Sequence, residues 1–266
     1  MNAKLSAIFP HRQFIVIGMI HLRPLPGSPR YQGNPGSVVE AALRDAQALA
    51  DGGVDGLMIE NFGDIPFFPD RVPAVTVAHL AATALAVRQR VPLPMGVNCL
   101  RNDGRAALAV AHAVGAEFIR VNVLCGARLT DQGLLSGIAH DLLRDRAGLG
   151  SNIGVFADVD VKHSAPLAIR PLEDEVDDIL HRGMADALIV SGTATGKSAD
   201  PTKVALVKQR AREAPVLVGS GVTVENVDQI RDICDGVIVG THFKKDGLVE
   251  AEVETQRVRA FLSRVR

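Results

Sequence analysis

The chain has 266 residues, with 29 lysines and arginines against 30 aspartates and glutamates, and a formal net charge of -1. This balance argues against a nucleic-acid-binding protein, which usually carries a basic excess. Apolar residues make up 47% and charged residues 22% of the chain, a composition typical of a folded globular protein that excludes a disordered or fibrous one.

The chain carries no signal for export or membrane insertion. Its three cysteines, Cys99, Cys125 and Cys234, are widely spaced, so neither a disulfide framework nor a zinc site is indicated. The N-terminus lacks the apolar core of a signal peptide, and apolar runs such as FIVIGMI fall far below the roughly 20 residues of a transmembrane helix. We expect a cytoplasmic protein, or one attached peripherally to a membrane.

Eight short runs rich in β-branched and apolar residues recur along the chain. The predicted strands occupy 14–20, 56–60, 93–98, 118–123, 152–161, 187–192, 215–221 and 236–241. The segments between them are typical of helices, most clearly 37–53, 75–90, 104–116 and 172–183. Apolar strands alternating with helices indicate a parallel sheet covered by helices. The sequence therefore predicts an α/β fold, a single (β/α)8 TIM barrel over residues 1–266, with an open doubly wound sheet as the alternative.

The longest predicted loops all follow strands. They span 21–36, 61–73, 124–133, 162–171 and 192–201. In a parallel barrel such loops gather at the C-terminal face, where catalytic residues lie. We therefore expect the functional site at that end of the barrel.

Charged residues end the fifth predicted strand. Because side chains alternate along a strand, Asp158, Asp160 and Lys162 are expected on one face. Burying them unpaired would cost several kcal/mol each, so they pair, bind a metal or face a solvated pocket. Polar residues also end the four preceding strands, namely His21, Glu60, Asn61, Asn98, Arg120 and Asn122. The sequence predicts a shared site, and the alternative is an internal ion network that only fills the barrel.

Glycines follow the seventh and eighth predicted strands. They stand in Gly219-Ser220-Gly221 and in Gly240-Thr241. Barrel enzymes often bind phosphate with these two loops, using backbone N–H groups and a short helix N-terminus. We expect these residues to bind phosphate, with simple tight turns as the alternative.

The segment 191–198, SGTATGKS, resembles a Walker A loop but has only three residues between its glycines, where the P-loop has four. We interpret it as a loop over the barrel mouth in which Ser191, Thr195 or Lys197 contacts a substrate. A plain flexible connection is the alternative interpretation.

These features favour an enzyme that acts on a small phosphorylated metabolite, a sugar or nucleoside phosphate, by lyase, isomerase or hydrolase chemistry. Asp158 or Glu60 would be the general base and Lys162 or His21 the acid or electrophile, while Arg120 and the asparagines would orient the substrate. Lys162 is also a candidate for Schiff-base formation.

A metal-assisted variant would hold Mg²⁺, Mn²⁺ or Zn²⁺ on Glu60, Asp158 and Asp160, with His21 or His163 as a further ligand. A dinucleotide-using oxidoreductase is a third and weaker alternative, because no dinucleotide-binding G-x-G-x-x-G motif follows a strand. A homo-oligomer is compatible with the sequence.

Several long segments resemble the BtpA/SgcQ family. They are IGMIHLRPLPGSPRY (17–31), GLMIENFGDIPF (56–67), RVNVLCGARLTDQGLLSG (120–137), ADVDVKHS (157–164), SGTATG (191–196), VGSGVTVENV (218–227) and DGVIVGTHFKKDG (235–247). The resemblance implies a TIM barrel. It also brings a second hypothesis, because one family member is linked to photosystem I biogenesis and peripheral thylakoid attachment, while others lie beside sugar-uptake genes. That hypothesis is a non-catalytic assembly or stabilising factor.

Overall fold

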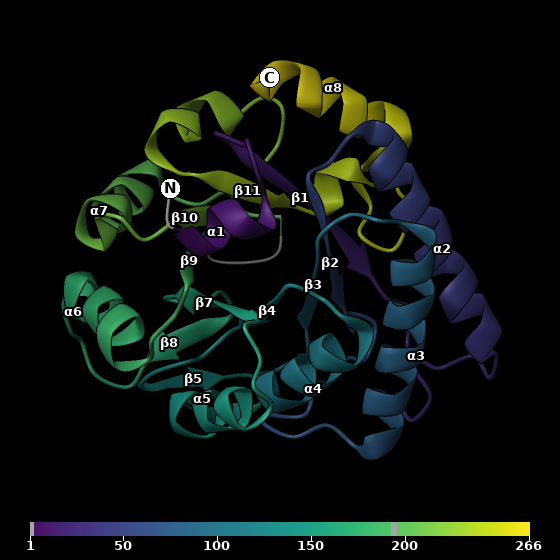
Figure 1. Ribbon diagram of the computed structural model, residues 1–266, viewed down its shortest axis with the longest axis horizontal. Coiled ribbons are helices and arrows are strands. Elements are labelled where there is room, and N and C mark those ends of the chain that lie inside the picture. Colours follow the sequence, from purple (N-terminus) through teal and green to yellow (C-terminus); the bar gives the residue numbers. More distant parts are fainter. Residues whose placement is uncertain (1–2, 193–195) are drawn as a thin grey trace.

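The computed structural model describes residues 3–192 and 196–266 and contains a closed barrel of eight parallel strands (Figure 1). The barrel strands are β1 (Ile15–His21), β2 (Gly56–Glu60), β3 (Met95–Asn98), β4 (Phe118–Val121), β7 (Gly154–Val159), β9 (Ala187–Ser191), β10 (Val216–Gly219) and β11 (Gly236–Val239). They follow one another around the ring in chain order, and β1 closes it by pairing with both β2 and β11. The predicted TIM barrel is confirmed.

Helices cover the outside of the barrel. They are α2 (Pro35–Gly52), α3 (Ala74–Arg90), α4 (Gly104–Val114), α5 (Ala139–Gly148), α6 (Leu172–Asp177), α7 (Pro201–Ala211) and α8 (Thr255–Val265). A π-helical turn, Asp178–Arg182, extends α6. After β10 the covering element consists of two 3₁₀ turns, Val227–Gln229 and Arg231–Ile233, and further 3₁₀ turns lie at Thr241–Phe243 and Lys245–Gly247.

Two helix boundaries coincide with residue types that commonly cap helices. Asp200 caps α7 by accepting a hydrogen bond from the N–H of Thr202 at 2.9 Å, with Pro201 in the first turn. Gly53 ends α2 in the left-handed conformation with φ 94°.

Two further elements lie outside the predicted pattern. Helix α1 (Ala3–Ile8) precedes the barrel, and β5 (Ala127–Thr130), β6 (Gly133–Ser136) and β8 (Ser164–Pro166) form an antiparallel sheet in the order β6-β5-β8. The three strands lie within or beside the predicted loops 124–133 and 162–171. They are only three or four residues long and most of their residues are exposed or half-buried, so they lack the apolar run that marks a buried strand.

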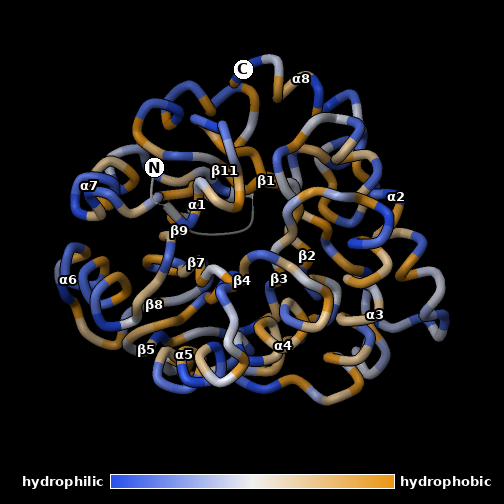
Figure 2. The backbone as a smooth tube through the Cα atoms, viewed as in Figure 1, coloured by the Kyte–Doolittle hydropathy of each residue, from blue (hydrophilic) through white to orange (hydrophobic). Residues whose placement is uncertain are grey.

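The N-terminal half of the barrel interior is apolar. Phe118 and Phe156 stack there with ring centroids 4.5 Å apart, and Phe9, which follows α1, lies 6.0 Å from Phe118. Fully burying each such side chain contributes about 1.5–3 kcal/mol. A larger apolar cluster fills the layer between strands and helices, and Figure 2 shows the strands mainly in the hydrophobic colour.

The barrel interior becomes polar toward the carboxyl ends of the strands. The inward positions nearest those ends carry His21, Glu60, Arg120 and Asp158, each two residues beyond an apolar interior residue of the same strand. The strands thus place a group of charged side chains directly above an apolar base. In the described part of the chain, every helix is too short or too polar to cross a membrane.

Candidate active site

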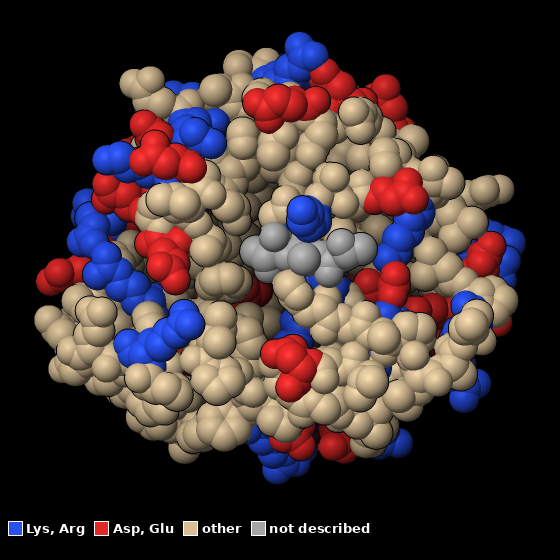
Figure 3. Space-filling model, turned by 180° about the vertical axis from the view of Figure 1, so that it is seen from behind, with Lys and Arg blue, Asp and Glu red and all other residues tan. Residues whose placement is uncertain are grey.

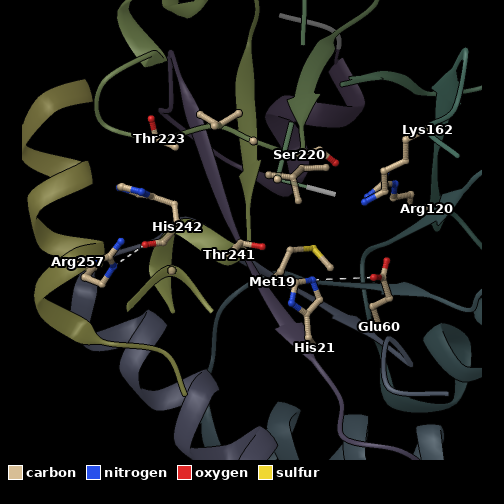
Figure 4. A pocket seen from close by; sticks show the side chains of 16 residues that line it. Met19, His21, Glu60, Arg120, Lys162, Ser220, Thr223, Thr241, His242 and Arg257 are labelled. Atoms are coloured by element: carbon tan, nitrogen blue, oxygen red, sulfur yellow. Dashed lines mark hydrogen bonds and ion pairs between the residues drawn. The ribbon is translucent and has the colours of Figure 1, made fainter. Parts of the chain in front are cut away.

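A cavity of about 210 Å³ opens at the carboxyl ends of the barrel strands (Figure 4). It brings together predicted residues from both halves of the chain: His21, Glu60, Arg120, Lys162, Ser220, Gly221, Gly240 and Thr241. Figure 3 views the molecule from the side opposite Figure 1 and shows acidic and basic side chains interspersed over that face. The cavity is large enough for a small molecule.

Arg120 on β4 and Asp158 on β7 form a buried ion pair in the wall of the cavity. The guanidinium binds the carboxylate through two nitrogens, with Nε–Oδ2 at 2.9 Å and Nη2–Oδ1 at 2.7 Å. Asn122 donates a third hydrogen bond to Asp158 Oδ2 at 2.7 Å. Because both carboxylate oxygens are engaged and the side chain is fully buried, Asp158 holds Arg120 in position and is poorly placed to be the general base.

Lys162 lies beyond the end of β7 and points into the cavity beside Arg120 (Figure 4). Burial and the charge of Arg120 lower the pKa of Lys162 to about 8, against the opposing influence of Glu60 and Asp158. Arg101 donates from Nη2 to the backbone oxygen of Lys162 at 2.6 Å and so fixes this turn. A substantial fraction of neutral amine is therefore present near pH 8, as a base or nucleophile requires.

Glu60 supplies a carboxylate on the opposite wall from Ser220. Asn98 donates to Glu60 Oε2 at 2.5 Å, which fixes the carboxylate and gives Asn98 a positioning role next to the cavity. The Glu60 side chain is almost completely buried, yet it lines the cavity. Glu60 thus provides a carboxylate in a fixed position that acts on the nearby amine of Lys162.

His21 ends β1 with its Nε2 4.0 Å from Glu60 Oε1. Burial lowers the pKa of His21 well below its usual value, and the cations Lys244, Lys162 and Arg120 lower it further. The imidazole is therefore neutral at physiological pH. Its ring lies so close to Gly240 that a Cβ there would come within 2.7 Å of His21 Cε1, so residue 240 must be glycine for the ring to keep this place.

The loop after β10 forms one side of the cavity. Ser220 and Gly221 both have positive φ, 68° and 63°, which turns this loop sharply at the mouth of the barrel. Asn226 braces the turn by donating to the Gly221 carbonyl at 2.7 Å and accepting from the N–H of Thr223 at 2.9 Å. The Ser220 side chain is held at the cavity surface as a hydroxyl donor (Figure 4).

Thr241 begins the 3₁₀ turn that follows β11. In residues 3–192 and 196–266 the backbone N–H groups of Thr241 and His242 donate to no acceptor, as expected for the first turn of a helix. Arg257 on α8 donates from Nε to the His242 carbonyl at 2.7 Å and also lines the cavity. Thr241, His242 and Arg257 thus all line this side of the cavity (Figure 4).

Sequence reasoning missed Arg257, His242 and Arg101. His242 directly follows the predicted Thr241, so extending the predicted loop by one residue would have included it. Arg257 lies in the first turn of the last helix and Arg101 beyond the end of β3, and neither position carries a local sequence signal.

The prediction that Asp160 shares the inward face with Asp158 and Lys162 is wrong. β7 ends at Val159, and Asp160 takes a positive φ of 50°, which breaks the alternation of side chains. Its carboxylate forms ion pairs with Arg128 and with Lys203, the latter at 2.5 Å, and both interactions lower the pKa of Asp160 against the effect of burial. Asp160 therefore joins outer elements of the fold and does not line the cavity.

Other predicted residues lie beside the cavity or elsewhere. Asn61 accepts from the N–H of Leu100 at 2.7 Å and shapes the loop after β3. Ser191 and Gly219 are buried strand-end residues that do not line the cavity, and Thr195 lies outside the described residues. Within the described ranges no group of three or more His, Cys, Asp or Glu side chains is arranged to hold a metal, so the predicted set Glu60, Asp158 and Asp160 is not brought together.

Solved structures of similar fold are TIM-barrel enzymes. Tryptophan synthase from M. tuberculosis is 19% identical, with a TM-score of 0.61 and 98% of this chain and 96% of that chain covered. N-(5'-phosphoribosyl)anthranilate isomerase from Pyrococcus furiosus is 15% identical, with a TM-score of 0.57 and coverage of 95% and 98%. At these identities the likeness shows the shared fold alone.

Sequence relatives are much closer. An uncharacterised protein of Thermococcus kodakarensis is 52% identical over 92% of each chain. The photosystem I biogenesis protein BtpA of Synechocystis is 44% identical over 93% of this chain and 86% of its own. Residues 12–266 match the BtpA family as a whole. The chain belongs to the BtpA family.

Proposed function

We propose that this BtpA-family chain is an enzyme that acts on a small phosphorylated carbonyl compound, such as a sugar phosphate, by transferring a proton beside the carbonyl group. One observation carries the proposal. A single cavity has hydroxyl and N–H donors on one side and an amine of lowered pKa with a fixed carboxylate on the other. The first side suits a phosphate, and the second suits the reacting carbon.

The phosphate would lie at the ends of β10 and β11. Ser220 and Thr241 would donate hydroxyl hydrogen bonds, and the N–H groups of Thr241 and His242 would add backbone donors. Arg257 would contribute positive charge from α8. The neighbours of similar fold include orotidine 5'-phosphate decarboxylase from Pyrococcus horikoshii, whose name also denotes a phosphorylated substrate. That likeness is one of fold, so the proposal rests on the cavity itself.

The reacting carbon would lie between Lys162 and Arg120. Neutral Lys162 would take a proton from the carbon next to the carbonyl, and Arg120 would stabilise the negative charge that forms on the carbonyl oxygen. Arg120 uses Nε and Nη2 to bind Asp158, so its Nη1 is the nitrogen for this contact. If the proton returns to the former carbonyl carbon while the proton of the neighbouring hydroxyl passes to the carbonyl oxygen, the enzyme is an isomerase. If instead a hydroxyl group leaves the next carbon and departs with a proton as water, the enzyme is a lyase.

Solvent deuterium exchange tests this function before the product is known. A panel of aldose and ketose phosphates in D₂O is incubated with the protein, and ¹H NMR follows loss of the signal beside the carbonyl. We expect exchange with the wild-type protein, none with Lys162→Met, and an unchanged rate with Lys245→Met, a control at an exposed lysine outside the cavity. Absence of exchange and of binding across the whole panel would overturn the proposal.

Borohydride reduction separates two uses of the same amine. If Lys162 attacks the carbonyl and water leaves, the resulting imine is reduced to a stable adduct that mass spectrometry locates on Lys162. If Lys162 only moves a proton, exchange proceeds and no adduct forms. The two results distinguish a Schiff-base lyase from proton transfer by an amine that forms no covalent bond to the substrate.

An assembly function is the second candidate, because the β6-β5-β8 sheet exposes apolar side chains. Leu129 and Leu134 are opposite one another in the sheet and are 53% and 55% exposed, and the nearby Leu167 and Ile169 are also exposed. The name of the Synechocystis relative favours such a function. In a host with a measurable phenotype, Leu129→Ser/Leu134→Ser would abolish an assembly role that Lys162→Met leaves intact, and enzymatic function predicts the reverse.

A further inference from the structure

We infer that a second cavity, next to the first, binds a second anionic group of the same substrate. The inference rests on the proposed function and extends it to the substrate class. The second cavity measures about 670 Å³ and lies between the loops after β1 and β2, the N-terminal half of α2 and the segment 244–252. His21 lines both cavities, so they meet at this side chain.

One wall of the second cavity is fixed by contacts between the loops after β1 and β2. The N–H of Gly63 donates to the Leu22 carbonyl at 3.0 Å, and the N–H of Leu25 donates to Asp64 Oδ1 at 2.7 Å. A Cβ at residue 63 would come within 2.5 Å of the backbone nitrogen of Pro24, so the two loops touch backbone to backbone. This wall is therefore formed before any ligand arrives.

The opposite wall is fixed by a buried ion pair. Lys244 binds Asp45 of α2, and the second oxygen of Asp45 accepts from the N–H of Val253 at 2.8 Å. The N–H of Lys245 donates to the Glu252 carbonyl at 2.9 Å, which closes the segment into a hairpin. Both walls are thus held by contacts with neighbouring elements of the fold.

Three exposed arginines line this cavity. Arg23, Arg30 and Arg44 form no ion pair with any residue of the described ranges, whereas the charge of Lys244 is neutralised by Asp45. The exposed Glu250 and Glu252 also line the cavity and contribute two negative charges. Guanidinium groups bind carboxylates and phosphates through two parallel hydrogen bonds, so this arrangement favours an anion.

His21 provides an independent sign of a ligand at the junction. Its side chain is only 9% exposed, and its Nδ1 is buried without a hydrogen-bond partner among the residues that the structure describes. A buried polar atom left unpaired costs about 1–3 kcal/mol, so a ligand that hydrogen-bonds Nδ1 would remove this cost. Because His21 lines both cavities, a molecule that spans them passes this side chain.

The substrate class that fits is a phosphorylated carbonyl compound with a second phosphate or carboxylate at its far end. The first phosphate would lie at Thr241, the reacting carbon at Lys162, and the second anion at the three arginines. A carboxylate and a phosphate share this chemistry, and matched probes distinguish them.

Calorimetric titration at 0.15 M salt tests the inference with fructose 6-phosphate, fructose 1,6-bisphosphate, ribose 5-phosphate and 5-phosphoribonate. We expect a second anion to increase affinity about tenfold in at least one matched pair, the gain from one charge-assisted contact. The variant Arg23→Gln/Arg30→Gln should abolish the gain and leave the affinity for the monophosphate unchanged. The matched control is Arg90→Gln/Arg231→Gln, two exposed arginines outside both cavities.

The outcomes separate the two proposals. Equal affinities within both pairs, or a gain that survives Arg23→Gln/Arg30→Gln, overturn the second anion site. If the monophosphates bind, Thr241→Val weakens them and the second anion adds no affinity, the proposed function stands while the second site falls. If no probe binds, the proposed function itself fails.

Discussion

The two ends of the barrel interior are built by the same strands and have opposite character. Phe118 and Phe156 stack at the N-terminal end, and two residues further along the same strands Arg120 and Asp158 form a buried ion pair. Side-chain alternation thus lets each strand contribute one residue to an apolar base and one to a polar site. Stability therefore depends mainly on the apolar end of the barrel interior, and chemistry on the polar end.

The energetic difference between the levels is large. Burying aromatic rings stabilises the fold, whereas a buried ion pair must first overcome the cost of removing two charges from water and is often no better than an apolar replacement. The Arg120–Asp158 pair is therefore weak evidence for stability. Because Arg120 lines the cavity beside Lys162, we attribute the charges at this level to the site.

Breaking the apolar base should reduce stability without affecting the site. Phe156→Ala removes a fully buried ring and should lower the free energy of unfolding by about 3–5 kcal/mol. Chemical denaturation measures this loss. Affinity for a sugar phosphate, measured by calorimetry on the folded variant, should stay within about twofold, and a parallel loss of binding would contradict the separation of levels.

Breaking the ion pair at the polar level should reduce stability, and chemical denaturation measures the loss. Asp158→Ala leaves the buried charge of Arg120 uncompensated and should lower the free energy of unfolding by about 3–5 kcal/mol. Asp160→Ala is the matched control and should cost less, because that side chain is 41% exposed and its buried partner Arg128 keeps a second ion pair with Glu175. Equal losses of unfolding free energy in the two variants would show that Asp158 contributes no more to stability than Asp160.

Removing the amine should affect mainly the chemistry of the polar level. Lys162→Met should reduce the deuterium-exchange rate by about 100- to 10,000-fold, the usual contribution of a general base. A variant that retains its exchange rate would remove Lys162 from the mechanism.

The smallest expected effect concerns one phosphate contact. Thr241→Val removes a hydroxyl at nearly constant volume and should weaken sugar-phosphate binding about 3- to 10-fold, close to the value of one hydrogen bond. Thr202→Val, at an exposed position on α7, is the control. Identical affinities in all three proteins would place the phosphate elsewhere.

The sequence predicts the barrel well because strand and helix patterns are local and their order fixes the topology. The convergence of Glu60, Lys162 and Thr241 follows from that order, since parallel strands bring their carboxyl ends to one face. The prediction for Asp160 was wrong because its positive φ turns the side chain away from the barrel interior. Outside glycine, no reliable local pattern in the sequence predicts a positive φ.

Other features depend on contacts between distant segments. Arg257 reaches the cavity from the last helix, and Asp45 meets Lys244 across 199 positions of sequence. Pairing of this kind is set by packing of the folded chain. The same holds for the β6-β5-β8 sheet, whose short strands acquire their structure from one another.

The pH dependence of deuterium exchange tests most directly whether the polar level of the barrel is an active site built around Lys162. Burial and Arg120 lower the pKa of Lys162 to about 8, and only the neutral amine accepts a proton, so the rate should rise through about pH 8 and level off above it. Because Glu60 raises this pKa, Glu60→Gln should move the rise to lower pH. A rate that shows no rise near pH 8, or one whose rise is unaffected by Glu60→Gln, would contradict the account.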